Sequence, residues 1–218
     1  MGLGQPLGFA YACEGNEHTE PPALDERPES QANFGLAQLC NKVDVGTAEV
    51  RGLLLGAVLN QHPPSVSVVQ LDPAAGTGPE VLDTDLFIPG VTPVPVGAGP
   101  THIVRAPDWG SFYVLSAGSR ELTRLVIGPI QARSKVGVET TRIPLPGVPG
   151  ELLATDAAIL VSALERPELW VLPVNPGPND DIVVIALEDT IQEMGMLEQS
   201  LVLTWRSRPL LSRWSGDL

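Results

Sequence analysis

The chain has 218 residues, of which 43% are hydrophobic, and it contains 22 glycines and 22 prolines. Neither glycine nor proline suits a helix interior, so this composition predicts one all-β domain in which many short strands are joined by turns. The net charge of −13 would repel phosphate backbones and anionic headgroups, which argues against nucleic acid as a partner. No apolar run approaches the ~20 residues that span a bilayer.

Residues 1–48 are predicted to combine a leader-like start with an acidic, proline-rich linker. The start, MGLGQPLGFAYAC, has small and apolar residues ahead of Cys13 but no basic segment. A simple disordered amino terminus is the favoured interpretation, and the remnant of an export signal cut before a lipidated cysteine is the alternative. Cys13 and Cys40 are the only cysteines and lack metal-binding or redox spacing, while a bridge between them stays open.

Residues 49–192 are predicted to form sheet repeats, because three hairpins of similar size follow one another. Each has two apolar strands around a polar turn. The first hairpin spans residues 51–71, with its turn at 62–65 and its second strand at 66–71. The second pairs residues 112–116 with 122–127, and the third pairs 159–163 with 169–174.

The second and third hairpins also share the segment that precedes them. VPVGAGPTHIV aligns with IPLPGVPGELL at a constant offset of 49 residues, as from Val94 to Ile143 and from Pro100 to Pro149. A fixed period of 40 to 50 residues with about four short strands is typical of the blades of a β-propeller.

The remaining carboxyl-terminal part is also predicted to be β-rich. Residues 175–181, NPGPNDD, read as a long turn, and residues 182–188, IVVIALE, as a buried strand. Residues 193–218 are predicted to be a β-rich tail or an incomplete further blade, with a strand, a turn at 206–209 and a shorter strand.

Residues 94–127 resemble one blade of the YVTN-type β-propeller repeats of bacterial surface and periplasmic proteins. Those repeats read I-P-V-G-x-x-P-x-x-I/V, then P-D-G, then an aromatic-containing strand and a further strand. The matching residues are Pro95, Val96, Gly97, Pro100, Ile103, Pro107, Asp108, Gly110, Tyr113, Val114, Ser119 and Leu122. Trp109 is one residue more than the usual P-D-G turn has.

The resemblance implies a partial β-propeller of about three four-stranded antiparallel blades, with a β-sandwich as the alternative fold. Propellers close with four to eight blades. The remaining blades must therefore come from the same polypeptide or from other copies of the chain, and we favour a piece of a longer protein.

Catalytic motifs are weak in this sequence. Ser116 in VLSAG lacks the first glycine of a nucleophile elbow and lies within a strand, so packing is the expected role. VGAGP, at residues 96–100, has no following helix and is predicted to be a turn rather than a phosphate loop. We predict no catalytic, cofactor-binding or metal-binding residue, and no cofactor.

A few residues could nevertheless bind metal or sugar. Asp83 and Asp85 share one face of an extended segment and could bind calcium, as could residues 179–181, but surface turns are expected for both. His18 lies in the linker and His62 in a turn, whereas His102 lies in a strand beside the propeller axis. A histidine satisfied by a backbone partner is favoured there. The tryptophans Trp109, Trp170, Trp205 and Trp214 are expected to fill the core or blade edges, with sugar stacking conceivable for Trp109.

The leading hypothesis is therefore a non-catalytic scaffold or recognition segment of an exported bacterial protein, at the cell surface or in the periplasm, with a lipoprotein anchor as one way of holding it there. Its partner would be a protein or a glycan. The alternative is a propeller-class hydrolase, similar to lactonases, that uses a divalent cation. Such an enzyme needs an acidic residue or a histidine on the inner strand of each blade, and His102 and Glu151, 49 residues apart, are the two candidates.

Overall fold

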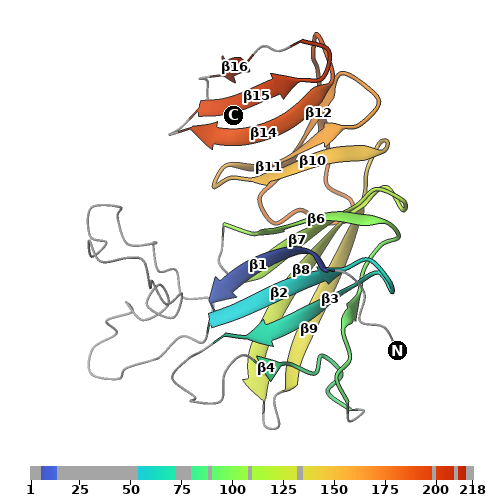
Figure 1. The fold of residues 1–218 in the computed structure, drawn as a ribbon, viewed down its shortest axis with the longest axis vertical. Coiled ribbons are helices and arrows are strands. Elements are labelled where there is room, and N and C mark those ends of the chain that lie inside the picture. Colours follow the sequence, from blue (N-terminus) through green and yellow to red (C-terminus); the bar gives the residue numbers. More distant parts are fainter. Residues whose placement is uncertain are drawn as a thin grey trace, which may run out of the picture.

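The computed structural model describes residues 6–13, 54–71, 80–87, 90–107, 110–131, 135–197, 200–208 and 211–214. The regular structure within these ranges consists of β-strands arranged in four sheets, here called A to D (Figure 1). None of the described segments is a helix with the length and apolarity needed to cross a membrane.

Each sheet is antiparallel, and its strands follow one another in chain order apart from β5. Sheet A contains β1 (Pro6–Cys13), β2 (Leu54–Asn60), β3 (Ser65–Gln70) and β4 (Glu80–Val81), and β5 (Val94–Pro95) also pairs with β3. Sheet B contains β6 (Pro100–Arg105), β7 (Ser111–Ser116), β8 (Glu121–Gln131) and β9 (Lys135–Pro144). Sheet C contains β10 (Pro149–Ala154), β11 (Ala158–Ala163), β12 (Glu168–Pro173) and β13 (Val183–Ala186). Sheet D contains β14 (Ile191–Leu197), β15 (Ser200–Trp205) and β16 (Leu211–Trp214).

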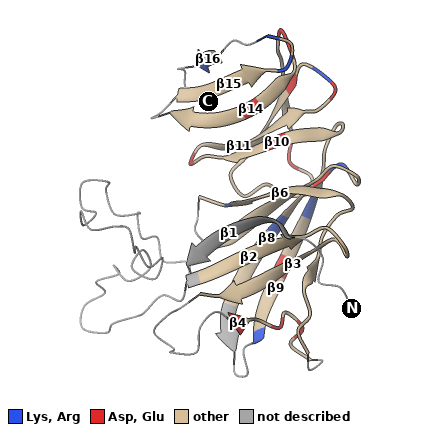
Figure 2. Cartoon of the chain, in the orientation of Figure 1, with Lys and Arg blue, Asp and Glu red and all other residues tan. Residues whose placement is uncertain are grey.

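The four sheets pack face to face in the order A, B, C, D, so each internal sheet buries both of its faces. Two apolar clusters lie between A and B, one between B and C, and one between C and D. Strands β7 and β11 are buried at every residue, which explains why their sequences, SFYVLS and AILVSA, do not alternate between polar and apolar residues. Charged residues lie mainly at strand ends and in connections (Figure 2).

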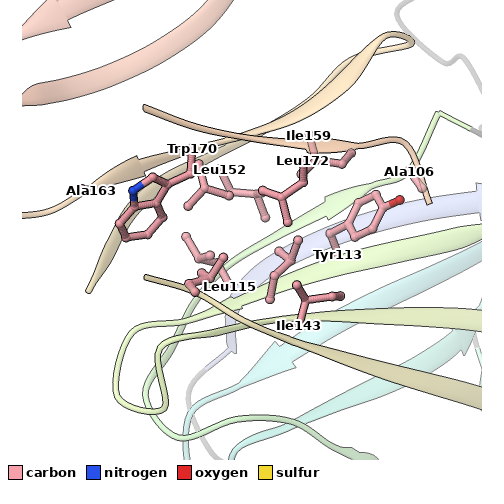
Figure 3. Packing of buried hydrophobic residues seen from close by; sticks show 12 residues of the cluster. Ala106, Tyr113, Leu115, Ile143, Leu152, Ile159, Ala163, Trp170 and Leu172 are labelled. Carbon is pink, nitrogen blue, oxygen red and sulfur yellow. The ribbon is translucent and has the colours of Figure 1, made fainter. Parts of the chain in front are cut away.

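Trp170 anchors the cluster between sheets B and C (Figure 3). Its side chain is fully buried, and its indole N–H donates a hydrogen bond to Glu168 Oε2 at 3.0 Å. The guanidinium of Arg166 lies over the ring, 6.0 Å from the centroid, and its Nη2 donates to the carbonyl of Pro146 at 3.2 Å. From sheet B, the hydroxyl of Tyr113 accepts a hydrogen bond from the backbone N–H of Asn175 at 3.2 Å. These contacts satisfy the hydrogen-bonding groups at the edges of an otherwise apolar interface.

The predicted hairpins are confirmed. They correspond to β2 with β3, β7 with β8, and β11 with β12, and the predicted carboxyl-terminal strand, turn and shorter strand are β15, residues 206–208 and β16. The all-β class is confirmed, and sheets B and C have the predicted four strands.

Two features differ from the prediction. The segment at 182–188 was predicted to be buried, but β13 is the outer strand of sheet C, and Val183 and Val184 are 59% and 49% exposed. An apolar run cannot distinguish an internal strand from an edge strand, because the distinction depends on what covers the sheet. In addition, β1 joins sheet A through β2, although the sequence predicted residues 1–48 to be a leader-like start and linker.

Candidate functional site

The first strands of the sheets lie next to one another, as the inner strands of a propeller do. Strand β6 packs against β1 and β10, and β10 packs against β14. Strands β6, β10 and β14 each have a register shift near their start, between Pro100 and His102, between Pro149 and Leu152, and between Ile191 and Glu193. Because the shift recurs at the same place in each inner strand, equivalent positions of these strands face a common axis.

The register shifts place three ionisable residues at equivalent positions. His102 is opposite Leu115 in β7, and Glu193 is opposite Thr204 in β15. Glu151 lies within the irregular segment of β10, where its backbone N–H donates to Ser162 Oγ at 2.8 Å. Glu193 went unnoticed in the sequence because sheet D does not follow the 49-residue period. The register of the bulge is the signal that identifies it.

His102 and Glu151 meet across the seam between sheets B and C. His102 Nε2 is 3.4 Å from Glu151 Oε2, and each side chain is 33% exposed. His102 Nδ1 is 3.1 Å from the hydroxyl of Thr101, so its ring is held from both nitrogens. The sequence related these residues only by their spacing, and the structure makes them neighbours. The backbone partner predicted for His102 is replaced by two side chains, those of Glu151 and Thr101. A partly solvated histidine–carboxylate pair can exchange protons or contribute two ligands to a cation.

A complete cation site is not formed by this pair. Among the residues that the structure describes, no three histidine, cysteine, aspartate or glutamate side chains lie close enough together to hold a metal ion. Glu193 is exposed on the neighbouring inner strand.

Asp83 forms a buried ion pair. It is 5% exposed, and its Oδ2 is 2.9 Å from Nζ of Lys135 at the start of β9. Its Oδ1 accepts the backbone N–H groups of Asp85 and Thr92, both at 3.1 Å. The bond to Lys135, reinforced by these backbone donors, lowers the pKa of Asp83 to about 2.

This arrangement corrects the two expectations for the LDTDL segment. Asp83 is buried rather than part of a surface turn, and the ammonium of Lys135 occupies the place that a calcium ion would need beside it. Lys135 Nζ also donates to the carbonyl of Asp85, which joins the loop and β9 more firmly.

The loop that Asp83 anchors carries an exposed apolar tip. Phe87 is 93% exposed and Val91 is 63% exposed. The backbone N–H of Phe87 donates to Asp85 Oδ1 at 2.9 Å, and Thr84 bonds to the carbonyl of Thr92 through its backbone N–H at 3.2 Å and through its hydroxyl. Hydrogen bonds at the base of the loop therefore hold its apolar tip away from sheet A.

The other turns behave as their sequences predict. Residues 179–181 are exposed, and Asp180 Oδ2 accepts the N–H of Gly177 at 2.8 Å, which is a surface turn. VGAGP is also a turn, with Gly99 at a φ of 60° and its carbonyl accepting the N–H of Ala117 at 2.9 Å. Ser116 is buried in β7, where its hydroxyl has no hydrogen-bond partner, which fits the expected packing role.

The remaining residues of interest divide between core, surface and segments outside the described residues. Trp170 fills the core as expected, and Trp205 packs partly buried against the cluster between sheets C and D, with Nε1 donating to Ser212 Oγ at 2.8 Å. His62 lies exposed in the turn after β2. Outside the described residues lie His18, Cys40 and Trp109, together with the side chains of Cys13 and Trp214.

Comparison with known proteins identifies the fold alone. No protein-family model matches the chain. A search of curated proteins likewise gave no match. The structure is similar to the dihydro-heme d1 dehydrogenase NirN, with a TM-score of 0.51 and 15% identity over 75% of this chain and 34% of that chain. It also matches a luciferin-regenerating enzyme with a TM-score of 0.43 and 10% identity, over 70% of this chain and 50% of that one. The chain thus spans a third to a half of the proteins that it matches.

The class is therefore that of β-propeller proteins. Four antiparallel sheets that pack face to face, with their first strands adjacent along one axis, match propeller structures. This class includes enzymes and non-catalytic proteins alike, so the fold by itself assigns no activity.

Proposed function

We propose that this chain is a non-catalytic β-propeller scaffold that presents a recognition surface, in an exported bacterial protein related to the YVTN-type repeats. The observation that carries the proposal is the tip at Phe87, which is 93% exposed on a loop fixed to the sheets by the buried Asp83–Lys135 pair. An exposed aromatic side chain on a braced loop loses little conformational entropy on binding, which favours recognition.

The surroundings of the ionisable and nucleophilic residues also support a scaffold. His102 is joined to Glu151, and Asp83 is joined to Lys135, so each pair links two elements of the fold. Ser116 is fully buried inside sheet B, where a substrate carbonyl has no access to it. Such contacts stabilise the blades and their loops.

A location at the cell surface or in the periplasm belongs to the same proposal, and its support is the resemblance of residues 94–127 to the YVTN-type repeats. A lipid on Cys13 is an alternative to strand β1, because cleavage before Cys13 would remove residues 6–12 from sheet A. Expression in a bacterial host with labelled palmitate decides between the two: label that enters the wild-type chain and is absent from Cys13→Ser would show cleavage and lipidation. An unlabelled wild-type chain that remains in the cytoplasm would refute the location.

The recognition role is tested with a printed glycan array and an immobilised peptide library. We expect saturable binding to one class of ligand, and Phe87→Ala should weaken it at least tenfold. Val183→Ala is the matched control, because Val183 is also exposed, at 59%, but belongs to sheet C. Turnover of a small-molecule ester or lactone by the purified chain would overturn the non-catalytic assignment.

A second candidate is a propeller hydrolase that uses a divalent cation, similar to lactonases. The observation that favours it is the equivalence of His102, Glu151 and Glu193 on three successive inner strands. A rise in melting temperature with calcium that Glu151→Ala abolishes would support this candidate. A melting temperature that does not change with calcium, magnesium or manganese would exclude it.

A further inference from the structure

The outer strand of sheet C, β13, has one edge that pairs with no strand in the described part of the chain. Along its other edge it pairs with β12, from Val171 opposite Val183 to Glu168 opposite Ala186. Sheet C is an internal sheet, and sheets B and D cover its two faces. Because the blades of a propeller pack face to face, further blades would not cover this edge.

The antiparallel ladder shows which backbone groups of β13 point outward. The N–H of Leu187, directly after β13, donates at 2.8 Å to the carbonyl of Pro167, directly before β12. Hydrogen-bonded and non-hydrogen-bonded pairs alternate along an antiparallel ladder. The odd-numbered residues of β13 therefore bond to β12, whereas the N–H and C=O groups of Val184 and Ala186 point away from it. These groups line the open edge.

The side chains of β13 place apolar surface on both sides of this edge. Ile182 packs against the cluster between sheets B and C, and Ile185 packs against the cluster between sheets C and D, which holds the strand in place. Val183 and Val184 are 59% and 49% exposed, and they project to opposite faces of the sheet. A strand added at the edge would therefore have an apolar cross-strand neighbour on each face.

The other outer strands carry the charges or interruptions that usually protect an edge. Strand β9 of sheet B contains Lys135, Glu139 and Arg142, and β16, the last described strand of sheet D, contains Arg213. In sheet A the outer position is divided between β4 and β5, with residues 82–93 between them. Strand β13 has the sequence VVIA, with no charge and no proline, so it lacks this protection against pairing.

Acidic residues flank β13 at both ends and indicate the charge of the partner. Asp180 and Asp181 precede the strand, and Glu188 and Asp189 follow it. Arg208 lies 3.6 Å from Glu188 and 3.9 Å from Asp189, which leaves the flanks with a net negative charge. A second copy of this chain would pair poorly here, because antiparallel and parallel pairing both place the acidic flanks of the two copies side by side. A basic segment would instead meet opposite charge at both ends.

We propose that β13 binds an extended, basic segment of a partner protein by strand addition. The backbone of this segment bonds to the outward N–H and C=O groups of Val184 and Ala186, and its apolar side chains pack beside the exposed valines. Its lysine or arginine side chains lie next to the acidic flanks. This site goes beyond the recognition role of Phe87 and does not depend on it, because the loop of Phe87 follows β4 of sheet A.

The probe is a fluorescently labelled synthetic peptide, KKVTVTVKK, whose binding to the full-length chain is measured by fluorescence polarisation. We expect saturable binding, and the acidic peptide EEVTVTVEE should bind at least tenfold more weakly. Val184→Pro should weaken binding of the basic peptide at least tenfold, because it removes an outward N–H and leaves the bonds to β12 in place. Val184→Ala is the matched control, because it keeps that N–H and should retain most of the affinity. Phe87→Ala should leave binding of this peptide unchanged.

The flanking charges are tested separately from the backbone. The double variant Asp181→Asn, Glu188→Gln should weaken binding of the basic peptide, and the loss should be smaller in high salt. Circular dichroism verifies that each variant is folded. If the double variant bound the basic peptide as tightly as the wild type at low salt, the proposed choice of a basic partner would be wrong.

Amide hydrogen exchange of the wild-type chain gives a readout that needs no variant. The amides of Val184 and Ala186 should exchange quickly in the free chain and at least tenfold more slowly with the basic peptide bound, whereas the amides of Val183 and Ile185 should be protected in both states. No binding of the basic peptide, or exchange at Val184 and Ala186 that the peptide leaves unchanged, would overturn the proposal. A wild-type dimer that Val184→Pro converts to a monomer would also overturn it, because a second copy would then occupy the edge.

Discussion

Gly97 is the position at which one added methyl group should disturb the blade most directly. A Cβ atom there would lie 2.1 Å from Ser119 Oγ, 2.5 Å from Glu121 Oε1 and 2.7 Å from Ser116 Cβ. The Ser119 hydroxyl can rotate away, but Ser116 is fully buried within β7 and has no space to move into. Gly97→Ala should therefore lower the free energy of unfolding by about 1–3 kcal/mol, the usual cost of overpacking. For a chain of this size, that loss lowers the melting temperature by roughly 2–12 °C.

Thermal and urea denaturation measure this effect, and the chain offers a matched control. The only atom that a Cβ on Gly137 in β9 would meet within 4 Å is Leu86 Cδ1 at 3.7 Å, an ordinary contact. Gly137→Ala should therefore change stability little. Adding Ser119→Ala to Gly97→Ala removes the nearest oxygen and should restore part of the loss. If Gly97→Ala were as stable as Gly137→Ala, the close packing of the 96–99 turn on sheet B would be refuted.

Two further substitutions test the core and the loop. Trp170→Ala should lower the free energy of unfolding, measured by urea denaturation, by about 3–5 kcal/mol, because it empties the centre of the cluster between sheets B and C. Leu211 is 66% exposed, so Leu211→Ala is the control. A smaller loss for Trp170→Ala than for Leu211→Ala would contradict this packing. Asp83 has a folded pKa of about 2 against 3.8 when unfolded, so its stabilising effect is complete above pH 3.8 and is lost as the pH falls toward 2. Lys135→Met should lower the melting temperature at neutral pH. The difference in melting temperature between this variant and the wild type should shrink as the pH falls from 3.8 toward 2. A difference that does not depend on pH would show that the Asp83–Lys135 ion pair does not stabilise the fold.

The strands that the sequence predicted are those with both faces buried or with a clear turn between them. Strands β7 and β11 are continuous apolar runs because two neighbouring sheets cover them, and the turns between hairpins contain glycine, proline or polar residues. Strand β9 escaped prediction because it lies at the edge of sheet B, where only some of its side chains are buried and Lys135, Glu139 and Arg142 interrupt the pattern. Edge strands of this kind are commonly polar, which protects the sheet from unwanted pairing. The same dependence on cover explains why 182–188 was predicted to be buried.

The candidate site shows a different limit, because its contacts are set by the packing of sheets rather than by local sequence. The period of 49 residues related His102 to Glu151, but equivalent residues of two blades touch only because the inner strands β6 and β10 converge at the axis. Asp83 lies in the loop after β4 of sheet A, and Lys135 begins β9 of sheet B. Because the two residues are 52 positions apart in the sequence, no motif predicts their ion pair. A repeat in the sequence thus identifies which positions correspond, and the angle between neighbouring sheets decides which of them meet. For this chain, that distinction places the strongest sequence evidence on the blade strands, whereas the proposed recognition loop, which carries Phe87, lies outside them.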